Sequence, residues 1–251
     1  MTSDEKVKLL VNYENKQKLT PKHFRKIIKF SDDKDVLVRS MVADLLINFE
    51  SNESKKVLLK LACDKKAMVR TSAYDSLAVF KSKKVEKFLK KAILNEKNEM
   101  ACSYAIMSWS DVAAALDEDL LKKKSFVSKI KKLSNIQKSE HCMLSCYYAL
   151  YVLGKKKSIK NITSFLNSKD YHIRCAVINV LRGFLTSDNQ QLIKKSLETL
   201  IKTIFFHFLF HQNANEYNLQ KKKKDASENY NRMPETFPIL NLLNTIINKF
   251  N

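Results

Sequence analysis

Glycine and proline are scarce in this chain. Its 251 residues include two glycines, Gly154 and Gly183, and three prolines. Folds made of strands and tight turns use many more of these residues, and loops that cradle phosphates depend on glycine. This scarcity excludes a P-loop or a dinucleotide-binding loop. It predicts helices joined by short polar turns.

The chain also lacks a long apolar run. Its first residues are charged, so we expect no secretory signal. The most apolar stretch, residues 200–211, is too short to span a bilayer and contains Lys202. The five cysteines are odd in number and form no CxxC pair, which is typical of reduced thiols. We therefore expect a cytoplasmic protein without membrane contact.

Acidic residues are outnumbered, with 26 Asp and Glu against 46 Lys and Arg and a net charge of +20. Such an excess suggests nucleic-acid binding. Arginine, whose planar fork recognises phosphate and guanine best, is scarce, and lysine carries almost all the charge. Lysine, asparagine and isoleucine together could also reflect an AT-rich genome. Nucleic-acid binding therefore stays an alternative.

Three segments of the chain share one skeleton, centred on Arg39, Arg70 and Arg174. A β-branched residue precedes each arginine, and apolar residues follow it at three, seven and ten positions. These offsets fall on one side of an α-helix, which predicts a buried stripe. The stripe comprises Val38, Val42, Leu46 and Phe49; Val69, Ala73, Leu77 and Phe80; and Ile173, Val177, Leu181 and Phe184. Six residues before each arginine stands a short acceptor that could cap a helix start, namely Asp33, Asp64 or Ser168.

Two weaker copies, around Cys102 and Met143, fill the gap between Arg70 and Arg174. The five copies follow one another at steps of 31, 32, 41 and 31 residues, and a second amphipathic segment precedes each. The stripes of the weaker copies are Ala101, Ala105, Trp109 and Val112, and Cys142, Cys146, Leu150 and Leu153. Helix pairs at a nearly fixed period predict an all-α fold, a right-handed α-solenoid of antiparallel helix pairs.

The aspartate, the Val-Arg pair and the following small residue and leucine resemble HEAT repeats, in the short form common in bacteria. The resemblance covers about residues 20–185 and is strongest at Arg39 and Arg70. It implies that the second helix of each pair lines a concave face. It also implies a structural role, linking neighbouring repeats, for Asp33, Arg39, Asp64, Arg70 and Arg174.

We expect three regions along the chain. Residues 1–211 form the solenoid, residues 212–233 a polar flexible loop, and residues 234–251 a C-terminal helix. The loop is predicted from its polarity and lack of periodicity. The last helix places its apolar residues on one side, so it should cap the final repeat or dock onto another subunit.

The predicted second helices are poor in lysine, which is absent from residues 99–109 and 140–153. The groove they form should therefore be poor in charge and lined by Tyr74, Tyr104, Trp109, Tyr147, Tyr148 and Tyr151. The predicted basic surface comprises Lys83, Lys84, Lys87, Lys90, Lys91, Lys122, Lys123, Lys124, Lys155, Lys156, Lys157, Lys221, Lys222, Lys223 and Lys224. An aromatic groove rimmed by lysines suits another protein with an acidic border.

Catalytic and metal-binding patterns are weak. His207 and His211 have the spacing of a metalloprotease helix, but Phe208 stands where its glutamate is needed. His141, Cys142 and Cys146 lie close together, and two of them belong to a predicted buried stripe, so packing is favoured over zinc binding or nucleophilic catalysis. We expect no catalytic residue, metal, cofactor or small-molecule substrate.

The sequence therefore favours a non-enzymatic scaffold that binds another protein through its groove. The first alternative is a nucleic-acid-binding protein that uses the lysine-rich helices and turns. The second is a DNA glycosylase of alkylation repair, similar to HEAT-like enzymes, in which Trp109 and Asp111 would act on the lesion.

Overall fold

The structure is a computed structural model and describes residues 1–198 except 17, 117–122, 124, 129 and 133–138. The described residues form helices and no strand, so the predicted all-α solenoid is confirmed. The chain divides into two compact units, Met1–Lys156 and Lys157–Asn251. The predicted loop and C-terminal helix, residues 212–251, lie outside the described residues.

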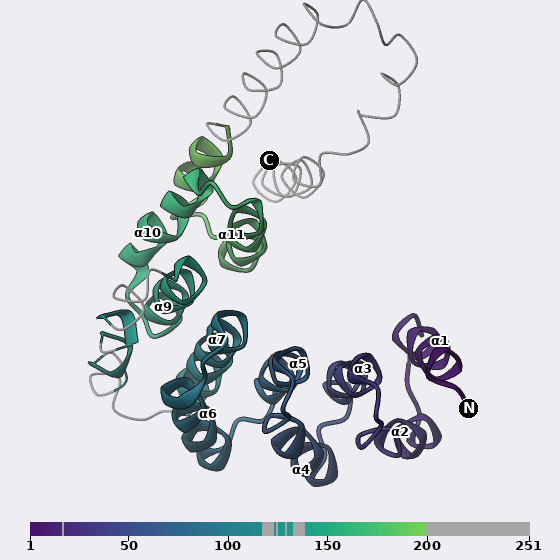
Figure 1. The fold of residues 1–251 in the computed structure, drawn as a ribbon. Helices are drawn as coiled ribbons and strands as arrows, with labels where there is room; N and C mark the ends of the chain where they lie inside the picture. Colours follow the sequence, from purple (N-terminus) through teal and green to yellow (C-terminus); the bar gives the residue numbers. More distant parts are fainter. Residues whose placement is uncertain (17, 117–122, 124, 129, 133–138, 199–251) are drawn as a thin grey trace, which may run out of the picture. The chain divides into compact units, whose positions relative to one another are not determined.

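The first unit consists of two layers of helices (Figure 1). The inner layer comprises α1 (Ser3–Glu14), α3 (Val36–Leu46), α5 (Ala67–Leu77), α7 (Glu99–Ala115) and α9 (Glu140–Val152). The outer layer comprises α2 (Pro21–Ile28), α4 (Asn52–Leu61) and α6 (Lys83–Asn95), and residues 123, 125–128 and 130–132 are also helical. Each inner helix packs against the next one along the chain.

Polar side chains start most of these helices by accepting hydrogen bonds from otherwise unpaired backbone N–H groups. Ser51, Ser82, Asn98 and Ser139 begin α4, α6, α7 and α9 in this way. Thr20 begins α2, and Pro21 occupies the first turn as the sequence predicts. These caps explain how so few prolines and glycines suffice to delimit the helices.

Helix α1 was not predicted, although its start carries a recognisable signal. Thr2 accepts a hydrogen bond from the Glu5 N–H, and the Glu5 carboxylate accepts one from the Thr2 N–H at 2.9 Å. This reciprocal pair is the capping box. Leu10 and Tyr13 are buried where α1 packs on α3, so α1 extends the inner layer by one helix before the first complete repeat.

The predicted stripes form the core. In the arginine-centred copies the residues immediately before the arginine and three and seven positions after it are buried, whereas Phe49 and Phe184 are half-buried. The stripes around Cys102 and Met143 are buried throughout. The helical period in the sequence therefore identified the packed side of each second helix.

The second unit is also helical in its described part. It contains η1 (Lys156–Ser158), α10 (Ile159–Ser164), η2 (Phe165–Asn167) and α11 (Tyr171–Phe184), and residues 190–198 are also helical. Before it, Gly154 closes α9 with a φ of 93°, a left-handed conformation that favours glycine. The Lys155 N–H then donates to the Leu150 carbonyl at 2.8 Å.

Candidate protein-binding face of the inner layer

Arginine side chains join consecutive repeats of the first unit. Arg39 donates from Nε and Nη2 to the two Asp64 carboxylate oxygens at 2.7 and 3.1 Å, and from Nη1 to the Asp33 carbonyl at 2.6 Å. Arg70 donates in the same way to Glu96, at 2.7 Å to each oxygen, and to the Asp64 carbonyl at 2.8 Å. Each arginine therefore ties its own repeat to the acid of the next.

The junction acids also order the turns that lead into the inner helices. Asp33, Asp64 and Glu96 accept hydrogen bonds from the N–H groups of Asp35, Lys66 and Asn98 at 3.0, 2.8 and 2.9 Å. Burial alone would raise the pKa of each acid. The hydrogen bonds from Lys6 to Asp33, from Arg39 to Asp64 and from Arg70 to Glu96, with those N–H groups, lower all three pKa values.

Glu96 was missed in the sequence, where no acid was assigned to the copy around Cys102. It stands six residues before Cys102, the position that Asp33 and Asp64 hold relative to their arginines. The longer side chain serves the same two purposes: it orders the turn before the helix through the Asn98 N–H, and it pairs with a cation. The helices themselves are begun by other residues, Asp35, Lys66 and Asn98, so the predicted capping by Asp33 and Asp64 is wrong. In the second unit, Arg174 donates to the Ser168 carbonyl at 2.5 Å, which matches the carbonyl contact of Arg39 and Arg70.

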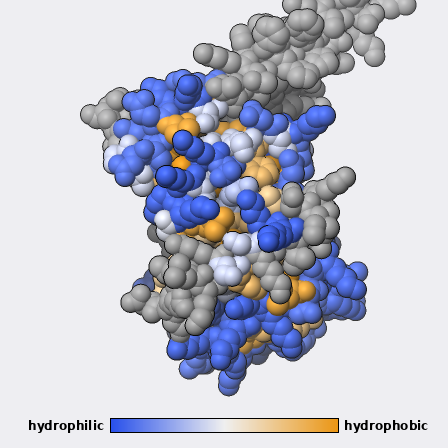
Figure 2. All heavy atoms as spheres, turned by 90° about the vertical axis from the view of Figure 1, so that its left-hand side faces the viewer, coloured by the Kyte–Doolittle hydropathy of each residue, from blue (hydrophilic) through white to orange (hydrophobic). Residues whose placement is uncertain are grey.

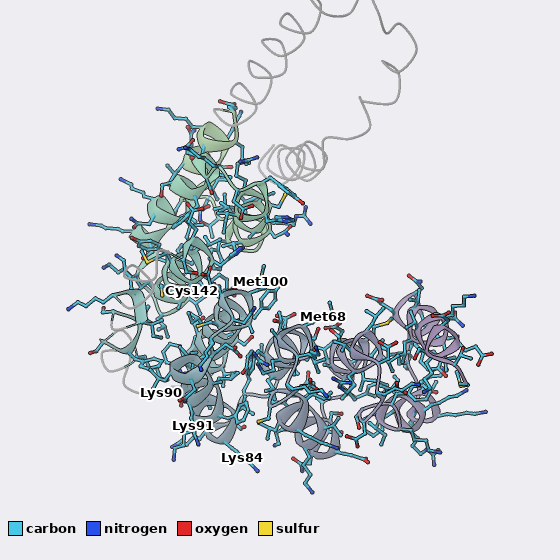
Figure 3. The ribbon with its side chains drawn as sticks, viewed as in Figure 1. Met68, Lys84, Lys90, Lys91, Met100 and Cys142 are labelled. Atoms are coloured by element: carbon cyan, nitrogen blue, oxygen red, sulfur yellow. The ribbon has the colours of Figure 1, made fainter. Side chains whose placement is uncertain are left out.

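The side of α3, α5 and α7 opposite the core carries a row of exposed apolar residues. Leu37, Met68 and Met100 stand two residues before Arg39, Arg70 and Cys102 and are 46%, 55% and 41% exposed. Figure 3 shows Met68 and Met100 projecting from the inner layer. We count positions in each repeat from Arg39, Arg70 or Cys102. With about 100° per residue around the helix axis, the positions −2, +2, +5 and +9 lie within about 60° of one another, so they form one surface.

We call this surface the inner face. Its members are Leu37, Met41 and Asp44 of α3; Met68, Ser72 and Asp75 of α5; Met100, Tyr104, Met107 and Asp111 of α7; and Tyr148 of α9. None of these residues is buried in the core. The repeat therefore places Leu37, Met68 and Met100 at equivalent positions of three consecutive inner helices, and Asp44 and Asp75 at equivalent positions of two.

Three aspartates give the inner face a negative charge that the sequence analysis did not expect. The groove was predicted to be poor in charge, but only lysine was considered there. Asp44 and Asp75 each stand five residues after their repeat arginine, and Asp111 lies one helix further along. Asp111 accepts a hydrogen bond from the Tyr148 hydroxyl at 2.9 Å, whereas no hydrogen bond or salt bridge joins the Asp75 carboxylate to any residue that the structure describes.

The protein surrounding these carboxylates weakens their hydration. Burial raises the pKa of Asp44, and the charges of Asp75 and Glu14 raise it further, although a hydrogen bond with Ser72 opposes this. Burial likewise raises the pKa of Asp75, with a contribution from Asp111. Burial also raises the pKa of Asp111, although its hydrogen bond with Tyr148 and the charge of Lys81 oppose this. Asp75 is thus close enough to repel Asp44, and Asp111 is close enough to repel Asp75.

The predicted aromatic lining of the groove is wrong for three of its six residues. Trp109 is fully buried and stacks edge-on against Phe126 at 4.9 Å between ring centres. Tyr74 is buried and donates from its hydroxyl to Glu96 at 3.2 Å, and Tyr151 is buried with Lys156 over its ring. Trp109 and Tyr151 fall on or beside the apolar stripe, and Tyr74 serves the repeat junction.

The other three predicted tyrosines are partly exposed. Tyr104 and Tyr148 belong to the inner face, where burial raises the pKa of both hydroxyls and nearby aspartates add to the effect. Tyr147 lies under the ammonium group of Lys131, 4.5 Å from the ring centre. Only Tyr104 and Tyr148 therefore remain as aromatic candidates for contact with a partner on the inner face.

Lysines of α6 lie away from the inner face. Figure 3 shows Lys84, Lys90 and Lys91 projecting from α6 on the outer side of the first unit, and the side shown in Figure 2 is largely hydrophilic. Lys83, Lys87, Lys155, Lys156 and Lys157 are also exposed. Lys122, Lys124 and Lys221–Lys224 lie outside the described residues.

Lys123 is an exception, and its assignment to the basic surface is wrong. It is 6% exposed, and its ammonium group donates to the carbonyls of Ala113 and Leu116 at 2.6 and 2.8 Å. These carbonyls close α7, where the last turn leaves acceptors unpaired. Lys123 therefore stabilises the end of α7.

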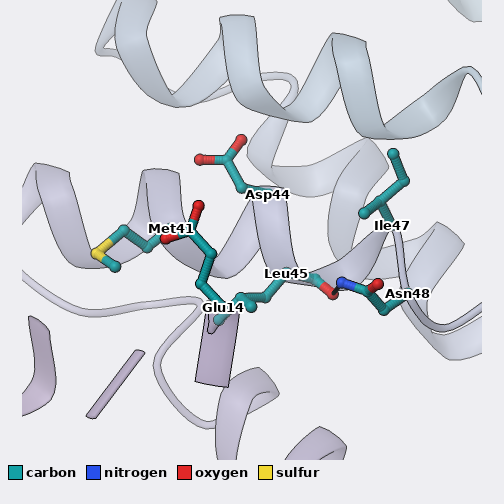
Figure 4. A pocket seen from close by; sticks show the side chains of 6 residues that line it. All are labelled: Glu14, Met41, Asp44, Leu45, Ile47 and Asn48. Atoms are coloured by element: carbon teal, nitrogen blue, oxygen red, sulfur yellow. Dashed lines mark hydrogen bonds between the residues drawn. The ribbon is translucent and has the colours of Figure 1, made fainter. Parts of the chain in front are cut away.

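A pocket of about 220 Å³ opens at one end of the inner face, between α1 and α3 (Figure 4). Met41, Leu45 and Ile47 supply apolar walls, and Glu14 and Asp44 supply carboxylates. The Asn48 amide donates to the Leu45 carbonyl at 3.1 Å beside it. The volume is below the roughly 300–1,000 Å³ of small-molecule sites, so the pocket suits a single side chain.

The described residues offer little for catalysis. No group of three or more His, Cys, Asp or Glu side chains among them could hold a metal ion. A hydrogen bond with Cys142 and burial raise the pKa of Cys102, which keeps that thiol protonated. Cys142 and Cys146 are buried, and His207 and His211 lie outside the described residues.

Over the described part of the chain, no helix has both the length and the apolar character that a bilayer span requires.

Comparison with known proteins agrees with this architecture. Residues 24–108, which run from α2 into α7, match the family model of HEAT repeats. The matched region contains the junctions Arg39–Asp64 and Arg70–Glu96 and most of the inner face. No curated protein matches the chain.

Proposed function

Because residues 24–108 match the family model of HEAT repeats, we propose that the chain is a non-enzymatic scaffold that binds another protein through the inner face of its first unit. HEAT repeats mediate protein interactions, and that general role is the starting point. The observation that carries the proposal is the row of Leu37, Met68 and Met100, exposed at the same position of three consecutive repeats. A cytoplasmic location is part of the proposal and is supported by five cysteines that form no disulfide.

The apolar row supports a binding role because exposing these side chains to water does not stabilise the fold. Two of the three residues are methionines, whose flexible side chains adapt to different partner surfaces. Tyr104 and Tyr148 stand on the same face and combine an apolar ring with a hydroxyl, as residues at the centre of interfaces often do. The face is continuous over α3, α5 and α7, so it can accommodate a long segment.

The proposal is tested with the full chain as bait, in extract of the native host treated with nuclease. The double variant Met68→Gln/Met100→Gln replaces two apolar side chains by polar ones of similar length and good helix propensity. The matched control is Leu94→Gln, at a residue that is 50% exposed on the outer helix α6. We expect the wild-type chain and the control to retain the same proteins and the double variant to lose them.

Equal retention by all three chains would overturn the proposal. Protein that is retained only without nuclease would indicate that nucleic acid bridges the contact. Thermal melting of each variant checks that the double variant is folded, and a melting temperature close to that of the control separates lost binding from lost structure.

Nucleic-acid binding is the second candidate, supported by the lysines of α6 on the outer side. Lys84, Lys87 and Lys91 are exposed there, and Lys90 lies 4.7 Å from the ring centre of Phe126. Filter binding of duplex DNA at two salt concentrations tests it, because phosphate contacts weaken steeply with salt. Lys84→Gln/Lys91→Gln should reduce such binding and leave protein capture unchanged.

A glycosylase finds no support at the residues suggested for it. Trp109 is fully buried, and Asp111 is hydrogen-bonded to Tyr148. Release of a base requires a group that can reach the extruded nucleotide. Trp109 cannot reach one.

A further inference from the structure

The inner face combines an apolar row with a negative charge, in a chain whose net charge is +20. Asp44, Asp75 and Asp111 come from three consecutive inner helices, and Glu14 of α1 extends the charge to the pocket. Asp75 lies near enough to raise the pKa of Asp44, and Asp111 near enough to raise the pKa of Asp75, although Lys81 offsets part of the charge at Asp111. A surface that keeps repelling carboxylates beside exposed methionines is complementary to a ligand with positive charges and apolar groups.

We infer that the inner face binds an extended segment of another protein that carries lysine or arginine side chains among apolar ones. This inference rests on the proposed function and specifies the chemistry of the partner. It replaces the acidic border that the lysines of the sequence had suggested, because Lys84, Lys90 and Lys91 of α6 lie on the outer side and the inner face carries Asp44, Asp75 and Asp111. Electrostatic complementarity of this kind gives specificity and orientation.

The pocket at the end of the face fits one side chain of such a segment. The stem of a lysine or arginine would lie against Met41, Leu45 and Ile47, and its charged end would lie between Glu14 and Asp44. Long basic side chains commonly bury their stems in this way and keep the charge at a polar edge. Figure 4 shows both carboxylates beside the apolar wall.

The spacing of the helices favours an extended segment with a basic residue at every third position. Packed helices lie about 8–10 Å apart, so equivalent residues of consecutive repeats should be separated by about that distance. A polyproline II segment advances about 3.1 Å per residue with three residues per turn, so every third side chain points the same way after about 9 Å. Each repeat could then contact one basic side chain, and residues between them could contact the methionine row.

The test uses four synthetic probes on the full chain, measured by fluorescence anisotropy. The first is a fluorescein-labelled peptide of four Lys-Leu-Pro units, in which proline keeps the chain extended. The second replaces lysine by glutamate, the third replaces lysine by glutamine, and the fourth replaces leucine by serine. We expect binding of the first probe, with the second and third bound at least about tenfold more weakly because their charge does not complement the face. The fourth should be weakened by loss of apolar contact.

The overall charge of the protein makes this test discriminating. A chain of net charge +20 attracts an acidic peptide and repels a basic one if only long-range attraction acts. Preference for the glutamate probe would therefore overturn the inference and indicate binding at the outer lysines. Preference for the lysine probe requires a local acidic site.

Two double variants with the same change in net charge locate that site. Asp44→Asn/Asp75→Asn removes two charges from the inner face. Glu50→Gln/Glu53→Gln removes two charges from exposed residues outside it, at the start of α4. We expect the first pair to weaken binding of the lysine probe about tenfold and the second pair to leave it nearly unchanged. Equal effects of the two pairs would overturn the inference.

The chain's own basic run, Lys221–Lys224, is an alternative occupant. If it covers the face, replacing all four lysines by alanine should tighten binding of the lysine probe at least tenfold, and that result would overturn the assignment to a partner protein. Unchanged binding supports it.

Native capture separates failure of this inference from failure of the proposed function. Proteins that are lost from Met68→Gln/Met100→Gln but retained by Asp44→Asn/Asp75→Asn would preserve the protein-binding face and overturn the basic segment. Loss from both double variants supports both.

Discussion

Two sets of carboxylates in the first unit have opposite effects on the fold. The junction acids Asp33, Asp64 and Glu96 are each held by a cation and a backbone N–H, which lower their pKa values despite burial. On the inner face, Asp44 and Asp75 meet no cation among the described residues at salt-bridge distance, and burial with mutual repulsion raises their pKa values. One set stabilises the stacking of repeats, and the other weakens the protein that carries it.

The difference distinguishes residues that serve the fold from residues that we propose for binding. A carboxylate that accepts hydrogen bonds from both a cation and a backbone N–H of its own chain stabilises the fold. A carboxylate that is partly dehydrated and repelled by its neighbours gains a favourable environment only when a cation arrives from outside. The same distinction applies to apolar residues, since the stripes are buried but Leu37, Met68 and Met100 are not.

The largest effect is expected from breaking a repeat junction. Arg39→Ala removes the partner of Asp64, whose side chain is 11% exposed and would be left as an unpaired charge. We expect the free energy of unfolding to fall by about 3–5 kcal/mol, as for other buried pairs that lose one member. Urea denaturation measures it, with Arg25→Ala on the exposed side of α2 as a control that should change stability by less than about 0.5 kcal/mol. A small effect at Arg39 would show that the junction contributes little.

The next largest effect is expected from acid, which protonates the junction acids and removes their contribution to stability. Their pKa values are lower in the folded than in the unfolded chain, so their stabilising contribution is full above about pH 5 and is lost as the pH falls through the folded values. Denaturation at a series of pH values from 7 to 3 should show this loss. In Asp64→Asn the loss should be smaller, because one of the three groups no longer titrates.

For Asp75 of the inner face we expect the opposite dependence of stability on pH. The pKa of Asp75 is raised in the folded chain, so its charged form costs stability at neutral pH and the cost disappears as the pH falls through the folded value. Asp75→Asn should therefore raise the free energy of unfolding at pH 7, by less than about 1 kcal/mol because solvent reaches the group. The gain over wild type should vanish in acid. A decrease in stability at pH 7 would show that Asp75 has a stabilising partner.

The smallest effect is expected on the outer layer. Lys84→Gln replaces an exposed lysine of α6 and should change stability by less than about 0.5 kcal/mol. It should also leave binding of the Lys-Leu-Pro probe unchanged or slightly tighter, because it removes one repelling charge. A large loss of probe binding would move the binding surface from the inner face to the outer layer.

Much of the fold could be predicted because the repeat follows from the spacing of residues that are close together in the sequence. The spacing around Arg39, Arg70 and Arg174 identified the buried stripes. The acceptor expected to cap each helix stands two residues before the actual N-cap, which is Asp35, Lys66 or Asp170. Helix α1 was missed because it has no arginine-centred stripe, although Thr2 and Glu5 form a capping box. Glu96 was missed because an acid of different length holds the position of Asp33 and Asp64.

The candidate site was predicted less well, because residue type was taken as a guide to exposure. Trp109 was assigned to the groove for its aromatic ring, yet it lies on the stripe that packs inward. Lys123 was assigned to the surface for its charge, yet it caps α7. Asp44, Asp75 and the row of Leu37, Met68 and Met100 were overlooked because their pattern appears only when consecutive helices are compared.

The sequence by itself determined the helical period, the stripe of each second helix and the recurrence of the pairs, because these depend on neighbours a few residues apart. Only the tertiary structure decided which charges meet. Stacking brings Arg39 to Asp64 and Arg70 to Glu96, about 26 residues away along the chain. The same stacking brings Asp44, Asp75 and Asp111 onto one face without a described cation at salt-bridge distance. Whether a carboxylate lies near a cation or near another carboxylate depends on distances that exist only in the folded chain.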